Sequence, residues 1–300
     1  MKTFRPLPIA TFGEALWDIL PRGIFLGGAP LNVAYHLSCN GVQAYPITAV
    51  GRDFLGEEIL RRLAAWRMDT RFVAQLPRSP TGTVRATLDA AGVATYDIAR
   101  DVAWDRIPVT APLLKSTPPA ALVFGSLALR ENPNRLALEK LCRAWPSTLR
   151  VLDINLRPPF DQPDAIAFAL KLAQLVKLND EELARLTSAP TGSLAQLRSA
   201  AGKFAATHGL KRVCVTAGAR GAGLWWEGNW HWSPGRKVVV RDTVGAGDSF
   251  LGALLASLLL RDLPPAQALA RACRLGEFIA SRDGATPPYR FNAKGQPVDA

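Results

Sequence analysis

Residues 241–250, which read RDTVGAGDSF, have the composition of a site that handles an anion. Gly245 and Gly247 stand one residue apart and let the backbone turn sharply into the apolar stretch that follows. Unpaired N–H groups and the positive end of a helix dipole then point at one spot, which favours binding of an anion. Asp248 lies in the same first turn, where its carboxylate would repel a phosphate unless it accepts a proton from an attacking hydroxyl.

These two elements are what phosphoryl transfer requires. The amides would meet the charge that develops on the transferring group, and Asp248 would orient the nucleophile. Taken alone, the segment is equally consistent with Asp248 as an ordinary acid in a first helical turn, favoured by the dipole.

A second segment, residues 27–34 (GGAPLNVA), brings paired glycines to a proline at the first helical position. Asn32, one turn in, offers both a donor and an acceptor to hydroxyl groups. The segment lacks the GxGxxG order of a dinucleotide site, and the absence of GxxxxGK[ST] excludes a P-loop fold. Alone, it could also be a tight turn into a helix with Asn32 facing solvent.

The elements that would position these residues alternate along the chain. Apolar runs predict strands, and apolar residues at spacings of three and four predict helices, the last of which starts after Ser193 and stops at Gly209. The predicted strands are residues 9–13, 44–50, 121–124, 150–154, 175–178 and 212–216. The predicted helices are residues 31–38, 54–66, 133–145, 165–172 and 194–208. Such alternation predicts an α/β three-layer sandwich with a mostly parallel central sheet.

One interval breaks the alternation. Residues 81–88 and 93–99 flank Ala90-Ala91-Gly92 and resemble a hairpin. With the strand predicted at residues 15–20, they would form a small β-sheet lid from insertions at about 14–25 and 81–100. No repeat or linker divides the chain, so we expect residues 1–300 to form one domain.

Together, the two glycine-containing segments resemble the signatures of the ribokinase-like, or PfkB, carbohydrate kinases. Segments between them are also similar to the family pattern: residues 50–56, 81–82, 125–126, 153–158, 177–182, 216–221 and 284–287. Ribokinases have Lys where Ala29 stands. The pattern Gly13-Glu14-x-x-x-Asp18, followed by residues 27–30, is most similar to fructokinases.

The resemblance implies a catalytic centre. Asp248 would be the general base that takes the proton from a sugar hydroxyl. The backbone amides of one turn would form the anion hole: Gly245, Ala246 and Gly247. The sugar hydroxyls would be bound by Asp248 and by three residues from the first part of the chain: Asp18, Gly28 and Asn32.

The resemblance also implies a nucleotide site with ATP and Mg²⁺. Its expected residues are Thr216, Gly218, Gly221, Asn179 and Arg157. An ion pair of Arg157 with Asp153 or a neighbouring acid is an equal alternative. Asn179 and Glu182 would hold Mg²⁺ through water. Glu182 could instead be a capping or solvated helix acid.

The family's monovalent-cation site uses carbonyls near Val244 and Gly284 and the carboxylate of Asp242. Pro288 falls where some members supply a side-chain oxygen, so K⁺ activation stays open.

Charge and composition limit other functions. Lys and Arg number 36 against 25 Asp and Glu, for a net charge of +11. These residues are scattered, which favours a general surface over a nucleic-acid face. The four cysteines lack metal spacing and indicate reduced core residues of a cytoplasmic protein. Residues 1–10 lack a signal-peptide pattern, and the apolar run 250–260 is too short for a membrane span, so a buried helix is expected there.

The remaining aromatic residues favour structural roles. Tryptophans around His231 indicate a hairpin at the sheet edge, turning at Gly228-Asn229, in preference to a base-stacking surface. His36, His208 and His231 are too scattered for a metal site, and we expect them at the surface.

The sequence therefore predicts an ATP-dependent sugar kinase, acting on fructose or a related sugar. A nucleoside or ribose kinase of the same family is the alternative, and a non-catalytic sugar-binding protein is a more distant one. Pairing of two lids would allow a homodimer.

Overall fold

The structure, a computed structural model, describes residues 7–21, 23–88 and 94–300. Its centre is a nine-stranded sheet, in which seven neighbouring strands run parallel and a hairpin adds two antiparallel strands at one edge. In spatial order the strands are β13 (Asn229–Pro234), β12 (Gly221–Trp226), β11 (Arg212–Thr216), β10 (Leu175–Asn179), β9 (Leu149–Asp153), β8 (Ala121–Gly125), β1 (Ile9–Phe12), β4 (Ala44–Gly51) and β5 (Val73–Leu76).

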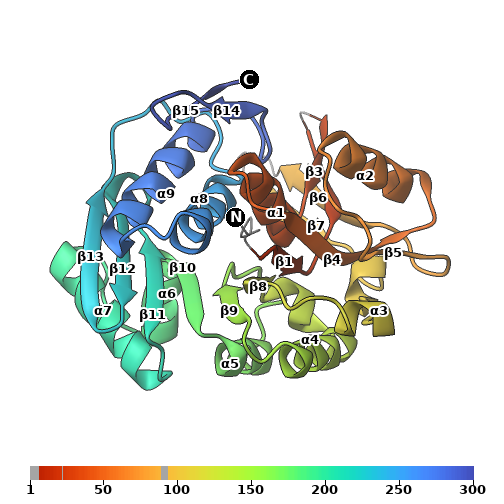
Figure 1. Cartoon of the computed structure of the whole chain (residues 1–300), viewed down its shortest axis with the longest axis horizontal. Helices are drawn as coiled ribbons and strands as arrows, with labels where there is room; N and C mark the ends of the chain where they lie inside the picture. The colour runs from red at the N-terminus through yellow and green to blue at the C-terminus, as the bar shows by residue number, and fades with distance from the viewer. Residues whose placement is uncertain (1–6, 22, 89–93) are drawn as a thin grey trace, which may run out of the picture.

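Helices cover both faces of this sheet (Figure 1). One face carries α1 (Ala29–Cys39), α2 (Phe54–Ala65), α8 (Ala246–Leu255) and α9 (Pro265–Ala280). The other carries α3 (Ala111–Leu114), α4 (Asn132–Ala144), α5 (Pro163–Leu172), α6 (Asp180–Thr187) and α7 (Leu194–Thr207). Each face has its own apolar core, with Leu31 and Leu251 in the first and Leu138 and Phe204 in the second. The predicted three-layer α/β sandwich is confirmed.

The predicted elements lie within a few residues of the observed ones. Ser193 caps α7 by accepting a hydrogen bond from Gln196 N, and Gly209 follows the helix with φ +61°. The buried helix expected at residues 250–260 is α8 continued by a π-helical segment, Ala256–Leu260. Single 3₁₀ turns are η1 (Ala103–Arg106), η2 (Leu127–Arg130) and η3 (Gly218–Arg220).

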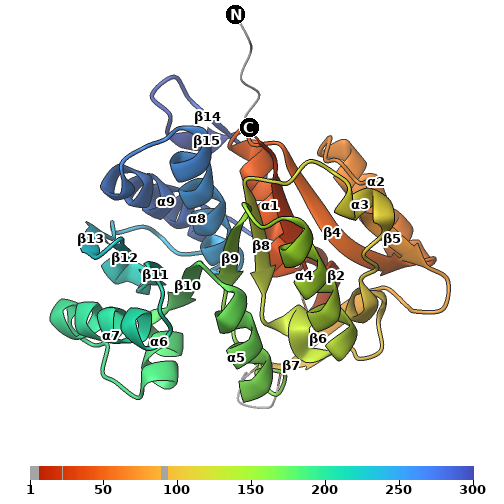
Figure 2. The same ribbon diagram turned by 60° about the horizontal axis from the view of Figure 1, so that its bottom comes forward.

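A second, four-stranded sheet lies beside the main one (Figure 2). Its strand order is β3 (Gly23–Gly27), β2 (Leu16–Leu20), β6 (Gly82–Leu88) and β7 (Ala94–Ile98), with β2 and β6 parallel. The segments are those expected for the lid; residue 22 and the expected turn at 90–92 lie outside the described residues. A small apolar core beneath this sheet includes Trp104. Arg130 stacks on the Trp104 ring and forms a 2.8 Å ion pair with buried Asp105.

The tryptophan hairpin is β12–β13, at the sheet edge as expected. Its turn lies at Glu227-Gly228, where φ is positive at both residues, one position before the predicted turn. The last strands, β14 (Tyr289–Phe291) and β15 (Pro297–Asp299), pair near the end of the chain.

The surface position expected for His36 is wrong, because its side chain is 0% exposed. Helix α1 packs between the sheet and α8 and is therefore buried on most sides. His208 is exposed, as expected, and His231 is partly exposed. All four cysteines are free. Among the described residues, the helices are too short or too polar to cross a membrane.

Candidate active site

The carboxyl ends of three neighbouring parallel strands bring predicted site residues together. Asp153 ends β9, Asn179 ends β10 and Thr216 ends β11, and Asn179 is the direct partner of Thr216 in the sheet. Open α/β sheets bind ligands at this edge.

Helix α8 begins at the same place. Gly245 is its N-cap, with φ +78°, and a Cβ there would lie 2.5 Å from Ala285 Cα. A Cβ on Gly247 would lie 2.9 Å from Lys177 Nζ. Gly245 therefore requires glycine, because a Cβ there meets backbone, whereas a Cβ on Gly247 would meet only the end of the Lys177 side chain. Among the described residues no side chain caps α8, and Ala246 N donates to the carbonyl of Thr243 at 3.2 Å, so the amides of this turn are not all unpaired as the sequence predicts. Asp248 lies in this first turn, as predicted, and the structure shows that it is buried.

Helix α1 brings the second segment against Asp248. Asn32 Nδ2 donates a 2.8 Å hydrogen bond to Asp248 Oδ2, so Asn32 does not face solvent. Gly28 has φ +110° and packs on the backbone carbonyl of Glu14, where a Cβ would collide. Asp18 lies beside Gly27, where an added Cβ would collide with the Asp18 carboxylate. The structure thus brings together the predicted sugar-binding residues.

Three carboxyl groups share this region. Burial raises the pKa of Glu14 to about 7 and that of Asp18 to about 6, and it also raises the pKa of Asp248. The charge of Arg157 lowers the pKa of all three. Glu14 accepts a 3.2 Å hydrogen bond from Ala29 N at the start of α1. Glu14 was not predicted as a site residue, although an acid directly after a predicted buried strand was the available signal.

Asp153 pairs with Lys177 and not with Arg157. Lys177 Nζ lies 2.9 Å from Asp153 Oδ1, and both side chains are buried. Burial disfavours the ammonium, but the carboxylates of Asp153, Asp248 and Glu182 outweigh it and raise the pKa of Lys177. The ammonium of this ion pair lies next to Gly247 in the first turn of α8. A lysine inside the apolar run of β10 was the signal for such a pair.

Asn179 and Glu182 form the capping box of α6. Asn179 Oδ1 accepts from Glu182 N at 2.7 Å, while Glu182 accepts from the backbone amides of Asn179 and Leu156, each at 2.8 Å. In the part of the chain that the structure describes, no three His, Cys, Asp or Glu side chains gather for a metal. Two side chains already engaged by amides fit an outer-sphere, water-mediated Mg²⁺ and not a protein cage.

The nucleotide residues predicted on the next strand lie beside this box. Gly218 and Gly221, in the loop after Thr216, have φ of +52° and +117°. Arg220 of this loop pairs with Asp180 of α6, which ties the loop to the capping box.

Asp242 braces two loops. Its carboxylate accepts hydrogen bonds from Val244 N at 3.0 Å and from Gly284 N at 3.1 Å. The loops that the resemblance assigned to a monovalent cation are therefore joined.

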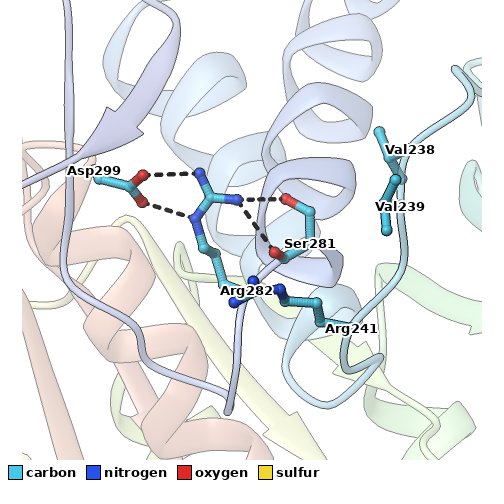
Figure 3. A pocket seen from close by; sticks show the side chains of 6 residues that line it. All are labelled: Val238, Val239, Arg241, Ser281, Arg282 and Asp299. Atoms are coloured by element: carbon cyan, nitrogen blue, oxygen red, sulfur yellow. Dashed lines mark hydrogen bonds and ion pairs between the residues drawn. The ribbon is translucent and has the colours of Figure 1, made fainter.

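Next to Asp242 lies an open hollow of about 660 Å³, in which Arg282 is held by Asp299 and Ser281 (Figure 3). Its lining is Val238, Val239, Arg241, Ser281, Arg282 and Asp299, so the sugar-site residues lie elsewhere.

The chain is similar in sequence and in fold to known sugar kinases. A fructokinase of Rhizobium leguminosarum bv. trifolii is 33% identical over 267 residues, covering 84% of this chain and 79% of its own length. A sugar kinase of Pyrococcus horikoshii solved in complex with ATP has a TM-score of 0.77 at 26% identity, covering 93% of this chain and 94% of its own. A fructokinase double mutant of Vibrio cholerae O395, solved with fructose, ADP and potassium ion, has a TM-score of 0.79 at 25% identity, covering 94% of each chain.

Residues 23–291 match the pfkB family carbohydrate kinases. The match spans both glycine-containing turns, the strand ends between them and the loop at Gly284. The chain therefore belongs to the PfkB family of carbohydrate kinases and is a sugar phosphotransferase.

Proposed function

We propose that this protein transfers the γ-phosphoryl group of ATP to a hydroxyl of fructose or a related small sugar, with Asp248 as the general base. The observation that carries the proposal is the meeting of Asp248, Asn32 and the glycine-containing turn at residues 245–247 at one helix start.

In this mechanism, Asp248 takes the proton of the attacking sugar hydroxyl. Burial raises its pKa, which makes it a stronger base than an exposed aspartate, while Lys177 and Asn32 act to keep it ionised. The amides of Gly245, Ala246 and Gly247 would hold the charge that develops on the phosphoryl group.

The sugar would lie between α1 and the second sheet. Asp18, Gly28 and Asn32 would bind its hydroxyls, and the second sheet would act as the lid that excludes water. We propose fructose as the first substrate to test, supported by the relative from Rhizobium, which is named a fructokinase, and by the Vibrio fructokinase, which was solved with fructose. A nucleoside or ribose kinase is the alternative.

ATP would bind along the strand ends, as supported by the sugar kinase solved with ATP. Thr216, Gly218, Gly221, Asn179 and Arg157 would contact it. Asn179 and Glu182 would hold Mg²⁺ through water, and this ion would neutralise phosphate charge. Asp242 would organise a monovalent-cation loop; the Vibrio fructokinase was solved with potassium ion.

The four free cysteines suit the reducing cytoplasm.

The test is an ADP-release assay over a panel of sugars and nucleosides with wild type, Asp248→Asn and Asp262→Asn. Asp262 is exposed after the far end of the helix that Asp248 begins, and it serves as the control. We expect turnover with fructose, a loss of about a hundredfold or more for Asp248→Asn and none for the control.

Near-normal activity of Asp248→Asn would refute the base assignment. Turnover of a nucleoside without any turnover of fructose would replace the proposed substrate. Binding of sugar without ADP release would favour the sugar-binding protein.

A further inference from the structure

Helix α1 presents one residue per turn to α8. Gly28, Asn32 and His36 are spaced by four and therefore lie on one side of the helix. Asn32 meets Asp248, and one turn further along both helices His36 meets Gly252, where an added Cβ would lie 2.9 Å from His36 Cβ. The two helices are thus in close contact along the line that leads away from the site.

Both ring nitrogens of His36 have partners. Nε2 lies 2.9 Å from the carbonyl oxygen of Ala285, and Nδ1 lies 3.0 Å from the hydroxyl of Tyr289. A carbonyl oxygen can only accept, so Nε2 carries the proton and Nδ1 accepts from the tyrosine. Burial lowers the pKa of His36 to about 4, so the ring stays neutral and keeps this tautomer at physiological pH.

Ala285 packs against the turn at residues 245–247, which is the proposed anion-binding turn. The left-handed Gly245 packs on it so closely that a Cβ would lie 2.5 Å from Ala285 Cα. The neighbouring Gly284 N donates to Asp242, which precedes that turn in the chain. Helix α1 holds the same loop a second time, because Tyr35 Oη donates to the carbonyl of Pro287 at 2.9 Å.

We infer that His36 is a positioning residue for phosphoryl transfer: by donating to the Ala285 carbonyl, it holds the loop 284–287 as the wall that fixes the turn at Gly245. The helix that presents Asn32 to the sugar thereby also sets the orientation of the anion-hole amides. This inference rests on the proposed role of residues 245–247.

The test compares His36→Leu, which removes the donor, with His36→Gln, whose amide can donate to Ala285 and accept from Tyr289. The exposed His208→Leu is the control. Displacement of the turn affects the transition state more than ground-state binding. We therefore expect His36→Leu to lower kcat about tenfold to a hundredfold, with KM for sugar and ATP changed less than about threefold. His36→Gln should recover most of kcat, and His208→Leu should match wild type.

Thermal unfolding of each variant gives a temperature at which all are folded, and the rates are compared there. In wild type, ¹⁵N NMR of the His36 ring should show the neutral Nε2–H tautomer. A ring that is cationic at pH 7 or protonated on Nδ1 would overturn the inference.

The kinetic outcomes separate the two proposals. If Asp248→Asn is inactive while folded His36→Leu keeps the wild-type kcat, loses activity through KM alone or is not rescued by His36→Gln, the positioning role is wrong and the base assignment stands. If Asp248→Asn is active, the proposed mechanism fails whatever His36 does.

Discussion

Asn32 and Asp248 are 216 positions apart in the chain and share a 2.8 Å hydrogen bond, from Asn32 Nδ2 to Asp248 Oδ2. The bond joins the first turns of α1 and α8, whose glycine-containing starts face the same site. It leaves Asn32 Oδ1 buried and without a hydrogen-bond partner among the residues that the structure describes.

Replacement of Asn32 by Ala should move the acid limb of the pH–rate profile. The hydrogen bond lowers the pKa of Asp248, so its loss raises that pKa further and leaves less ionised base at a given pH. The acid limb of kcat/KM should therefore shift upward by about one pH unit. Steady-state kinetics from pH 5 to 9 measure it, with exposed Asn132→Ala as the control. An unshifted limb would show that the bond does not tune the base.

Gly245→Ala should reduce kcat by about a hundredfold, because the added Cβ collides with Ala285 and φ is +78°. Gly209→Ala is the matched control: its φ is +61°, and open space surrounds it. Gly209→Ala should lose about 1 kcal/mol of stability and no activity. Kinetics and thermal unfolding distinguish the two, and equal activities would contradict the anion-hole role.

Glu14→Gln should stabilise the protein in a pH-dependent way. Burial raises the pKa of Glu14 from 4.5 to about 7, so the native state binds the proton more tightly than the unfolded chain. The bound proton therefore stabilises the native wild type fully below about pH 4.5, and this stabilisation is lost as the pH rises through about 7.

At pH 8 the glutamine variant should be more stable than wild type by up to about 3 kcal/mol, with the gap closing toward pH 5. Urea unfolding at the two pH values measures this, with exposed Glu57→Gln as the control. A gap that widens toward pH 5 would contradict the raised pKa.

Lys177→Met should destabilise the fold by about 3 to 5 kcal/mol, because it leaves the buried carboxyl of Asp153 without its partner. The double variant with Asp153→Asn should recover part of the loss. Arg61→Met, which breaks an exposed pair with Glu58, should cost less than about 1 kcal/mol. Denaturant titrations measure the loss of unfolding free energy in each variant. Similar losses for Lys177→Met and Arg61→Met would contradict a larger contribution of the buried pair to stability.

Local signals predicted much of this fold. Ser193 and Gly209 marked both ends of α7, and unbroken apolar runs located the parallel strands. The turn at residues 245–247 and its aspartate could be interpreted as an anion site because that chemistry resides within one short segment.

The contacts that sequence could not supply join distant segments. His36 was expected at the surface because helical spacing does not show that both α8 and the loop at Ala285 cover that turn of α1. The pairing of Lys177 with Asp153 depends on the sheet order, which places β9 beside β10. Asn179 and Glu182 cap α6, and the further hydrogen bond from Leu156 N to Glu182 joins segments 26 positions apart, which local sequence does not reveal.

The position of β1 has a consequence for synthesis on the ribosome. This first strand lies inside the sheet, between β8 and β4, and the helix that follows it packs on α8. A nascent chain that ends before residue 246 would leave the apolar surface of α1 open to water and would lack Asp248. Premature termination should therefore yield an aggregation-prone fragment and not a weakened kinase.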